Sequence, residues 1–176
     1  MKILLHICCA PCTIYPLRIL RERGFYVQGF FFNPNIHPFA EYIRRRDTLS
    51  DFAGHMLLSV FFYPEYPVEE FLGDILSAGS ERCRRCYRMR LRVAAGAARR
   101  DGFENFTTTL LYSKFQKHDW IREEGERAAG EAGVKFYYED FRPGWEEGVE
   151  TSKAMGMYRQ RYCGCILSEI ERFLKQ

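Results

Sequence analysis

The chain has 176 residues, enough for one domain with a substantial core, and a net charge of only +3. Apolar residues make up 47% of it and aromatic residues 16%, which excludes an intrinsically disordered chain. No apolar run approaches the roughly 20 residues of a membrane span, so we expect a cytoplasmic protein that does not enter a membrane.

Strands and helices alternate along the chain. The predicted strands are 3–7, 26–32, 56–62, 105–111 and 134–138, and the predicted helices are 15–23, 39–53, 68–78, 83–99, 119–132, 152–160 and 165–174. Residues 139–150 are predicted to form a loop with aromatic anchors. The alternation predicts a single α/β domain over residues 1–176, with a doubly wound, mostly parallel sheet and helices on both faces.

The seven cysteines fall into three short groups: Cys8-Cys9-x-x-Cys12, Cys83-x-x-Cys86 and Cys163-x-Cys165. The number is odd and the expected compartment is reducing, so we interpret them as metal ligands or redox thiols instead of disulfides. The first group lies between the first strand and the first helix, where parallel sheets bind ligands. Because a helix N-terminus is partly positive, that position favours thiolates. We expect the fold to gather all seven thiols into one metal centre.

The number of thiols bears on which metal they bind. A closed zinc site uses four ligands, so seven cysteines are too many for one zinc and too few for two all-cysteine sites. An iron–sulfur cluster with an adjacent metal, or with spare redox thiols, uses the number better. Both metals accept tetrahedral sulfur ligands, so zinc stays open, as does burial of some cysteines as ordinary apolar residues.

Basic residues are concentrated in two stretches. Residues 82–100 contain eight arginines and no acidic residue, and residues 44–46 are three consecutive arginines. Such patches are typical of phosphate and RNA binding. Residues 158–162 mix tyrosine with basic residues, which suits stacking on bases, although a helix surface with a core tyrosine is an equally simple interpretation. His6 lies inside the first strand and is predicted to be a core histidine.

Five motifs together resemble the QueH-type epoxyqueuosine reductases, over nearly the whole chain. They are residues 4–12 (LLHICCAPC), 33–36 (NPNI), 82–91 (RCRRCYRMRL), 107–113 (TTTLLYS) and 158–165 (YRQRYCGC). The resemblance implies a fold like that of the nucleotide α-hydrolase (HUP-like) Rossmann-type proteins, with the cysteine turn in place of an ATP loop. It also implies reduction of epoxyqueuosine, at the wobble position of tRNA, to queuosine. The implied cofactors are a [4Fe–4S] cluster and one additional iron.

The resemblance also suggests roles for individual residues. The cluster ligands would be Cys9, Cys12, Cys83 and Cys86, and Cys8, Cys163 and Cys165 would hold the second iron. We expect catalysis by the latter three thiols together with Tyr158. Proton donors to consider are Tyr158, Tyr162, His37 and Asp140. The predicted substrate-binding residues are Asn33, Asn35, Arg88, Thr108, Thr109, Ser113, Arg159 and Gln160.

The sequence contains no Gly-x-Gly-x-x-Gly fingerprint for a flavin or nicotinamide, so we expect an external one-electron donor such as a ferredoxin or flavodoxin. Two alternatives stay open. A tRNA-thiolating enzyme on the same fold would carry sulfur on its cysteines, but this chain lacks an ATP-binding loop after its first strand. A zinc-stabilised tRNA-binding module would need no redox chemistry at all.

Overall fold

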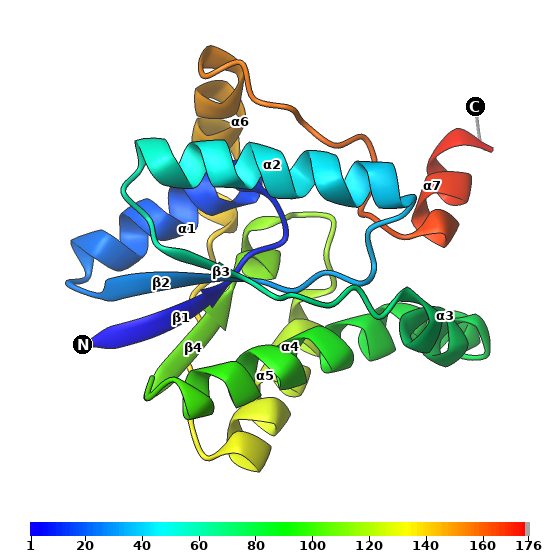
Figure 1. Cartoon of the computed structure of the whole chain (residues 1–176), viewed down its shortest axis with the longest axis horizontal. Coiled ribbons are helices and arrows are strands. Elements are labelled where there is room, and N and C mark those ends of the chain that lie inside the picture. Colours follow the sequence, from blue (N-terminus) through cyan, green and yellow to red (C-terminus); the bar gives the residue numbers. More distant parts are fainter. Residues whose placement is uncertain (175–176) are drawn as a thin grey trace.

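The computed structural model describes residues 1–174 and contains one sheet of five parallel strands (Figure 1). The predicted domain of residues 1–176 ends with two residues outside that range. The strands are β1 (Lys2–His6), β2 (Tyr26–Phe31), β3 (Val60–Phe62), β4 (Asn105–Thr108) and β5 (Lys135–Phe136), in the order β3-β2-β1-β4-β5. The central β1 pairs Ile3 with Val27 on one side and with Asn105 on the other. The predicted α/β class and parallel sheet are confirmed.

Helices cover both faces of this sheet. One face carries α1 (Ala10–Glu22), α2 (Phe39–His55) and α6 (Trp145–Ala154), and the other carries α4 (Arg82–Arg100) and α5 (His118–Ala132) (Figure 1). Two further helices, α3 (Val68–Leu76) and α7 (Ile166–Phe173), lie at one end of the molecule. Short 3-10 turns follow β4 at Thr109–Tyr112 and precede α4 and α6 at Gly79–Glu81 and Arg142–Gly144.

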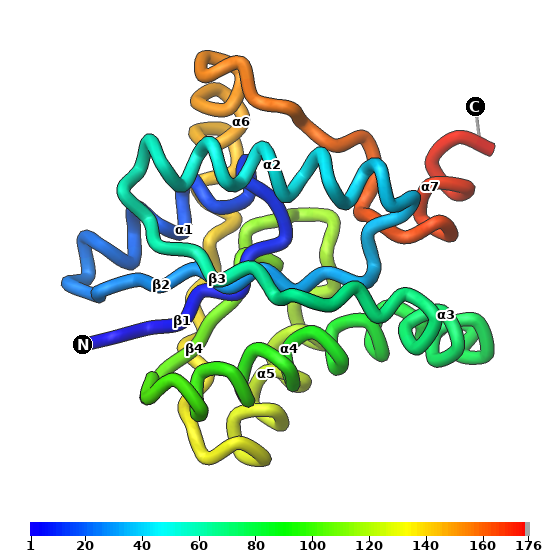
Figure 2. The backbone as a smooth tube through the Cα atoms, viewed as in Figure 1, coloured from blue at the N-terminus to red at the C-terminus, as the bar shows by residue number. Residues whose placement is uncertain are grey.

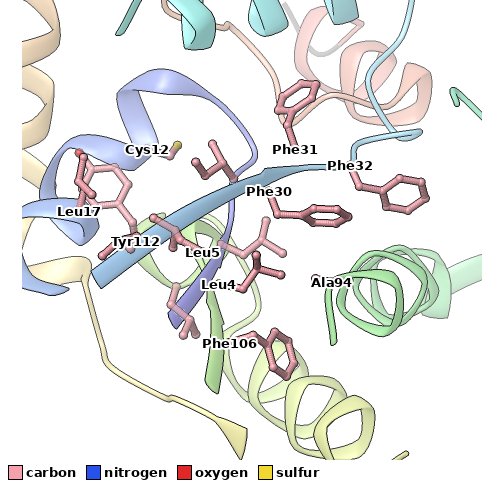
Figure 3. Close-up of a cluster of buried hydrophobic side chains, with 14 of the residues drawn as sticks. Leu4, Leu5, Cys12, Leu17, Phe30, Phe31, Phe32, Ala94, Phe106 and Tyr112 are labelled. Carbon is pink, nitrogen blue, oxygen red and sulfur yellow. The ribbon is translucent and has the colours of Figure 1, made fainter. Parts of the chain in front are cut away.

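The core is formed where the central strands meet the flanking helices. Leu4 and Leu5 of β1, Phe30 of β2 and Phe106 of β4 are almost fully buried, and Figure 3 shows them gathered around β1 and β2. β1 and β2 are mostly apolar because helices cover both of their faces, whereas Phe106 is the one apolar residue of β4. The arrangement leaves the carboxyl ends of β1, β2 and β4 free to carry polar and sulfur side chains.

The structure departs from the predicted elements at α1 and α6. Helix α1 begins at Ala10, five residues before the predicted start, with Pro11 in its first turn. The predicted loop at 139–150 contains most of α6, and the predicted helix at 152–160 is wrong beyond Ala154. Gly156 has a φ of +62°, a left-handed conformation that does not continue a helix.

The predicted strand at 105–111 is shorter than expected and ends at Thr108. The Thr108 hydroxyl accepts a hydrogen bond from the Leu110 N–H at 3.1 Å, which turns the chain into a 3-10 segment. The predicted strand at 56–62 is reduced to Val60–Phe62. Over residues 1–174, no helix combines the length and the apolar character that crossing a bilayer requires.

Residues 155–165 join α6 to α7 without helix or strand, in the orange part of the tube that passes α2 in Figure 2. This joining segment carries the last two cysteines. The start of this segment depends on how α6 packs. Gly148 of α6 lies against Tyr112, and the side chain of Ser152, one turn later, is fully buried.

We predict that Gly148→Ala destabilises the protein by about 1 to 3 kcal/mol, because a Cβ there would overlap the Tyr112 hydroxyl. Gly130→Ala is the matched control: this helical glycine of α5 is exposed and has open space around it, so alanine should stabilise by about 0.5 to 1 kcal/mol. Urea unfolding of both variants in the same metal state measures the difference. Equal midpoints would contradict the tight packing of α6.

Candidate metal centre

Three thiols meet where β1 leads into α1. The ligand atoms of Cys8, Cys9 and Cys12 all lie within 4.8 Å of one another, and 3.8 Å separate the sulfurs of Cys8 and Cys9. Cys9 is the N-cap residue of α1, and the first turn of this helix contains no acidic side chain. The thiols therefore face the positive end of the helix. Among the residues that the structure describes, this is the one compact group of three potential metal ligands.

The environment of these thiols favours one negative charge among the three. Hydrogen bonds from Cys12 and Cys9, with help from Arg90 and the Thr109 hydroxyl, hold the pKa of Cys8 well below its usual value despite burial. Burial raises the pKa of Cys9, and hydrogen bonding to Cys8 raises that of Cys12. These shifts favour the negative charge on Cys8, with Cys9 and Cys12 as its hydrogen-bond donors. Binding a metal would displace the remaining protons.

The other four thiols come from α4 and from the joining segment. Cys83 and Cys86 lie in the first turns of α4, and Cys163 and Cys165 lie just before α7. Burial raises the pKa of Cys86 to about 12, and the charges of Cys163 and Cys165 act in the same direction. Cys163 is also close enough to Cys8 for the two charges to interact. The fold thus brings all three cysteine groups into one region, and all seven thiols are free.

The geometry of the thiols bears on the predicted division between cluster and second iron. Cys8 lies with Cys9 and Cys12 in the compact group of thiols. The division that places Cys8 on the second iron and the pooled set of seven ligands both stay predictions.

Arg90 of α4 is a buried cation inside this region, with an exposure of 1%. Its Nη2 donates to Asn33 Oδ1 at 2.6 Å, and its Nη1 lies 3.8 Å from Cys86 Sγ. Within residues 1–174 its guanidinium has no carboxylate partner, and its Nε has no hydrogen bond. Burial acts to lower the pKa of Arg90, but the negative charges of Cys86, Cys8 and Cys163 outweigh burial and raise that pKa. A buried cation needs an opposite charge, and here sulfur supplies it.

Amide and hydroxyl groups donate directly to the sulfurs. Gln160 Nε2 lies 2.9 Å from Cys9 Sγ and 3.9 Å from Cys12 Sγ, and Gln116 Nε2 lies 3.3 Å from Cys163 Sγ. The Thr109 hydroxyl donates to Cys8 Sγ at 3.2 Å and accepts from the Cys8 N–H at 3.0 Å. Donors of this kind orient sulfur ligands and tune the potential of a metal centre.

Sequence analysis missed two of the residues that contact sulfur. Arg90 follows Cys86 by four residues, so helical spacing could have placed both on one face of α4. Gln116 lies in the loop between Tyr112 and α5, and nothing in its sequence context indicates that it contacts Cys163.

The joining segment is held against α2 and the loop after β2 by polar contacts. Arg45 of α2 donates to the backbone oxygens of Cys163 and Tyr162 at 2.8 and 3.2 Å and pairs with Glu41 at 2.7 Å. Glu41 also accepts from the Tyr158 hydroxyl at 2.7 Å. Because Arg45 is only 2% exposed, these bonds are shielded from water. These contacts of Arg45 and Glu41, which we call the clamp, fix the backbone of the segment that carries Cys163 and Cys165.

The candidate proton donors are engaged in structural contacts. Tyr158 bonds to Glu41, and the Tyr162 hydroxyl donates to the backbone oxygen of His37. The His37 ring contacts the Pro34 oxygen through Nε2, at 2.9 Å, and accepts from the Ile166 N–H through Nδ1, at 3.1 Å. Asp140 forms an ion pair with Arg142. Within residues 1–174, none of these hydrogen bonds and ion pairs involves a cysteine sulfur, and the role of donor stays a prediction.

The predicted substrate-binding residues do not share one site, and most of them form hydrogen bonds within the protein. Asn33 bonds Arg90 and the Ile7 oxygen, and Asn35 lies beneath Gly164. The Thr108 hydroxyl lies 2.8 Å from His6 Nδ1, and the Ser113 hydroxyl accepts from the Phe115 N–H. His6 is fully buried and its Nε2 donates to the Phe32 oxygen at 3.2 Å, so it is the satisfied core histidine that the sequence predicted.

Arg88 pairs with Glu124 of α5 at 2.9 Å, and the Thr108 hydroxyl bonds inward to His6. Contact of these two residues with substrate stays a prediction. Arg159 and Gln160, by contrast, line a hollow of about 70 Å³ with Cys12, Tyr112 and Trp145. That volume is below the roughly 300 Å³ at which small-molecule sites begin, so the hollow adjoins the thiols without enclosing a substrate.

The arginine run of α4 is not the free basic patch that the sequence suggested. Within the described chain, carboxylates from other elements or neighbouring positions pair with six of its eight arginines, namely Arg82, Arg84, Arg85, Arg88, Arg92 and Arg100. The buried Glu124 of α5 alone accepts from Arg84 and Arg88. The run therefore mainly attaches α4 to its neighbours, and the absence of acidic residues within it misled the interpretation.

The donor set fits an iron–sulfur centre. The seven thiols are free, sulfur ligands suit iron–sulfur clusters and zinc alike, and the unmatched guanidinium of Arg90 requires negative charge among them.

A family model for epoxyqueuosine reductase QueH matches residues 3–171. The chain belongs to this family. It is 38% identical to the epoxyqueuosine reductase QueH of Dehalococcoides mccartyi, over 99% of this chain and 96% of that protein. It is 41% identical to the QueH protein of Thermotoga maritima, over 97% of this chain and 91% of that protein.

A solved structure supports the fold of this QueH chain. It is the predicted subunit of a tRNA methyltransferase from Methanocaldococcus jannaschii, which aligns with a TM-score of 0.56 over 87% of this chain and 74% of that one. At 11% identity the likeness concerns the fold alone.

We predict that Arg90→Met raises the pKa of Cys8 by about one to three pH units, because the opposite charge beside the thiolate is lost. Thiolate absorbance near 240 nm, followed against pH in reduced, metal-free protein, measures the change. Arg92→Met is the matched control: it removes an exposed arginine of the same helix that pairs only with Glu131. An unchanged titration in Arg90→Met would show that Arg90 does not stabilise the thiolate.

We also predict that Gly164→Ala lowers iron bound per chain by half or more. Gly164 has a φ of +155°, and a Cβ would lie 2.9 Å from Asn35 Nδ2 and 3.3 Å from its backbone oxygen. Alanine would therefore displace the cysteines on either side. Iron analysis after anaerobic reconstitution measures the loss, with Gly156→Ala in the same segment as control for positive φ alone. Full iron content in Gly164→Ala would contradict this role.

Proposed function

We propose that this chain reduces epoxyqueuosine in tRNA to queuosine at a metal centre held by its cysteines. The observation that carries the proposal is the compact group of Cys8, Cys9 and Cys12 at the start of α1, with Cys86 beside the buried guanidinium of Arg90, in a chain of the QueH family. Removing the epoxide oxygen to leave an alkene takes two electrons and two protons and releases water. The centre must therefore pass electrons and activate a C–O bond.

The pooled set of seven cysteines would hold a [4Fe–4S] cluster and one additional iron. Cys9, Cys12, Cys83 and Cys86 are the proposed cluster ligands, and Cys8, Cys163 and Cys165 those of the second iron. When bound, such a centre supplies one-electron transfer and a Lewis acid for the epoxide oxygen.

The protein's own residues prepare this site. Arg90 balances the negative charge of the thiolates, while Gln160 and Thr109 orient the sulfurs that face them. The bonds from Arg45 hold the backbone of the joining segment at Tyr162 and Cys163. Tyr158 and Tyr162 both lie on that segment, on either side of Gln160, and we retain Tyr158 as the proposed catalytic acid.

Two partners follow from this proposal. One is tRNA that contains epoxyqueuosine, and the other is an external one-electron donor such as a ferredoxin or flavodoxin. Support for the second is that the chain has no fingerprint of a bound flavin or nicotinamide, so its electrons must arrive from outside.

We predict that anaerobically purified protein is brown and contains about five irons and four acid-labile sulfides per chain. With a reduced donor it should convert epoxyqueuosine in tRNA to queuosine, as measured by mass spectrometry of digested nucleosides. Cys163→Ser should lower that rate at least tenfold, because it removes a proposed ligand of the second iron. Ser50→Ala, an exposed substitution on α2, is the control.

Three results would contradict parts of this proposal. One zinc per chain, no sulfide and no colour would end the reductase proposal and leave the zinc-stabilised tRNA-binding module. Full activity of Cys163→Ser would remove Cys163 from the mechanism. Iron and sulfide without turnover of epoxyqueuosine would leave a metalloprotein with another substrate.

A further inference from the structure

An aromatic row leads from the thiols to the surface of the molecule. Tyr112 stacks on Trp145 with ring centroids 5.2 Å apart and an interplanar angle of 28°. Trp145 in turn contacts Phe115 edge to face, at 5.4 Å and 86°. Tyr112 is buried and Trp145 half-buried, whereas Phe115 is 76% exposed, more than any other aromatic residue in the described part of the chain.

Cations accompany this aromatic row. Lys114 Nζ lies 5.3 Å from the centroid of the Trp145 ring and 5.5 Å from that of Phe115. In residues 1–174, neither Lys114 nor Arg159 has a carboxylate within ion-pair distance. They differ in this from the arginines of α4, most of which are paired. Their charges are therefore available to an anionic partner.

The same elements reach the metal-binding region. Tyr112 and Trp145 line the hollow at Cys12 together with Arg159 and Gln160. The loop that exposes Phe115 also carries Gln116, whose amide donates to Cys163 Sγ. One loop thus contacts the Cys163 thiol through Gln116 and also carries the exposed Phe115 ring with Lys114 beside it. A ligand on this surface would lie near the thiols.

We propose that Phe115 and Lys114, with Trp145 and Arg159, form the surface on which unpaired bases of the substrate RNA stack beside the metal centre. This inference rests on the proposed function and adds the residues that hold the RNA. Unpaired bases of RNA loops stack on exposed aromatic rings, and lysine and arginine contact the phosphates that join them. A protein partner would find a mobile lysine and one protruding ring, without the larger apolar patch that most protein interfaces contain.

The test is fluorescence anisotropy with a labelled anticodon stem–loop RNA. Loss of one stacked base should make Phe115→Ala bind at least about fivefold more weakly, and Phe115→Trp should restore binding. Lys114→Ala should lower the slope of log affinity against log salt by about 0.7. Tyr26→Ala and Lys2→Ala are the matched controls, since they remove an exposed aromatic residue and an exposed lysine at the amino ends of β2 and β1.

A fully paired RNA duplex serves as the second probe, and its weaker binding should not change in Phe115→Ala. Wild-type affinity of Phe115→Ala for the stem–loop would overturn this surface and leave the proposed function intact. Unchanged RNA binding together with slower reduction by flavodoxin, but not by dithionite, would assign the surface to the electron donor and also overturn the inference. If the wild type binds no tRNA, the proposed function is overturned, and the inference that rests on it is overturned as well.

Discussion

The buried guanidinium of Arg90 constrains the whole region around it. A charge in a dry interior is stable only beside an opposite charge, and here the neighbouring groups are thiols and one amide. Hydrogen bonds from Cys12 and Cys9, together with the charge of Arg90, lower the pKa of Cys8, while burial raises the pKa of Cys9 and hydrogen bonding to Cys8 raises that of Cys12. The same cation would offset the charge of an anionic cluster. Helix α4 thus contributes two thiols and the charge that balances them.

Much of the fold was predictable because parallel strands that are covered by helices have short apolar runs in their sequence. β1 and β2 lie within a residue of their predicted ranges, since most of their residues are apolar and buried between the helices. α6 and the joining segment were not predictable from local pattern. The first depends on Trp145 packing against Tyr112, and the second on a backbone conformation at Gly156, both set by tertiary contacts.

The candidate site shows the same division. Cysteine spacing was enough to predict that three groups converge, because the motifs fall at the ends of predicted elements. Only some of the residues that donate to the thiols could be predicted from the sequence. Thr109 and Gln160 belong to recognised motifs, whereas Gln116 lies in a loop that has no recognisable sequence pattern. The arginines of α4 illustrate the opposite error, since the acids that pair with them, such as Glu124, lie about 35 to 40 residues away in sequence.

The position of the last two cysteines has a consequence for synthesis of the protein. Cys163 and Cys165 are fixed by Arg45 and by the loop after β2, so their contacts span most of the chain. During translation the first five thiols emerge long before this pair. An incomplete chain consequently presents cysteines without the residues that close the centre over them. With the seven-cysteine centre that we propose, loading of metal would be coupled to completion of the polypeptide.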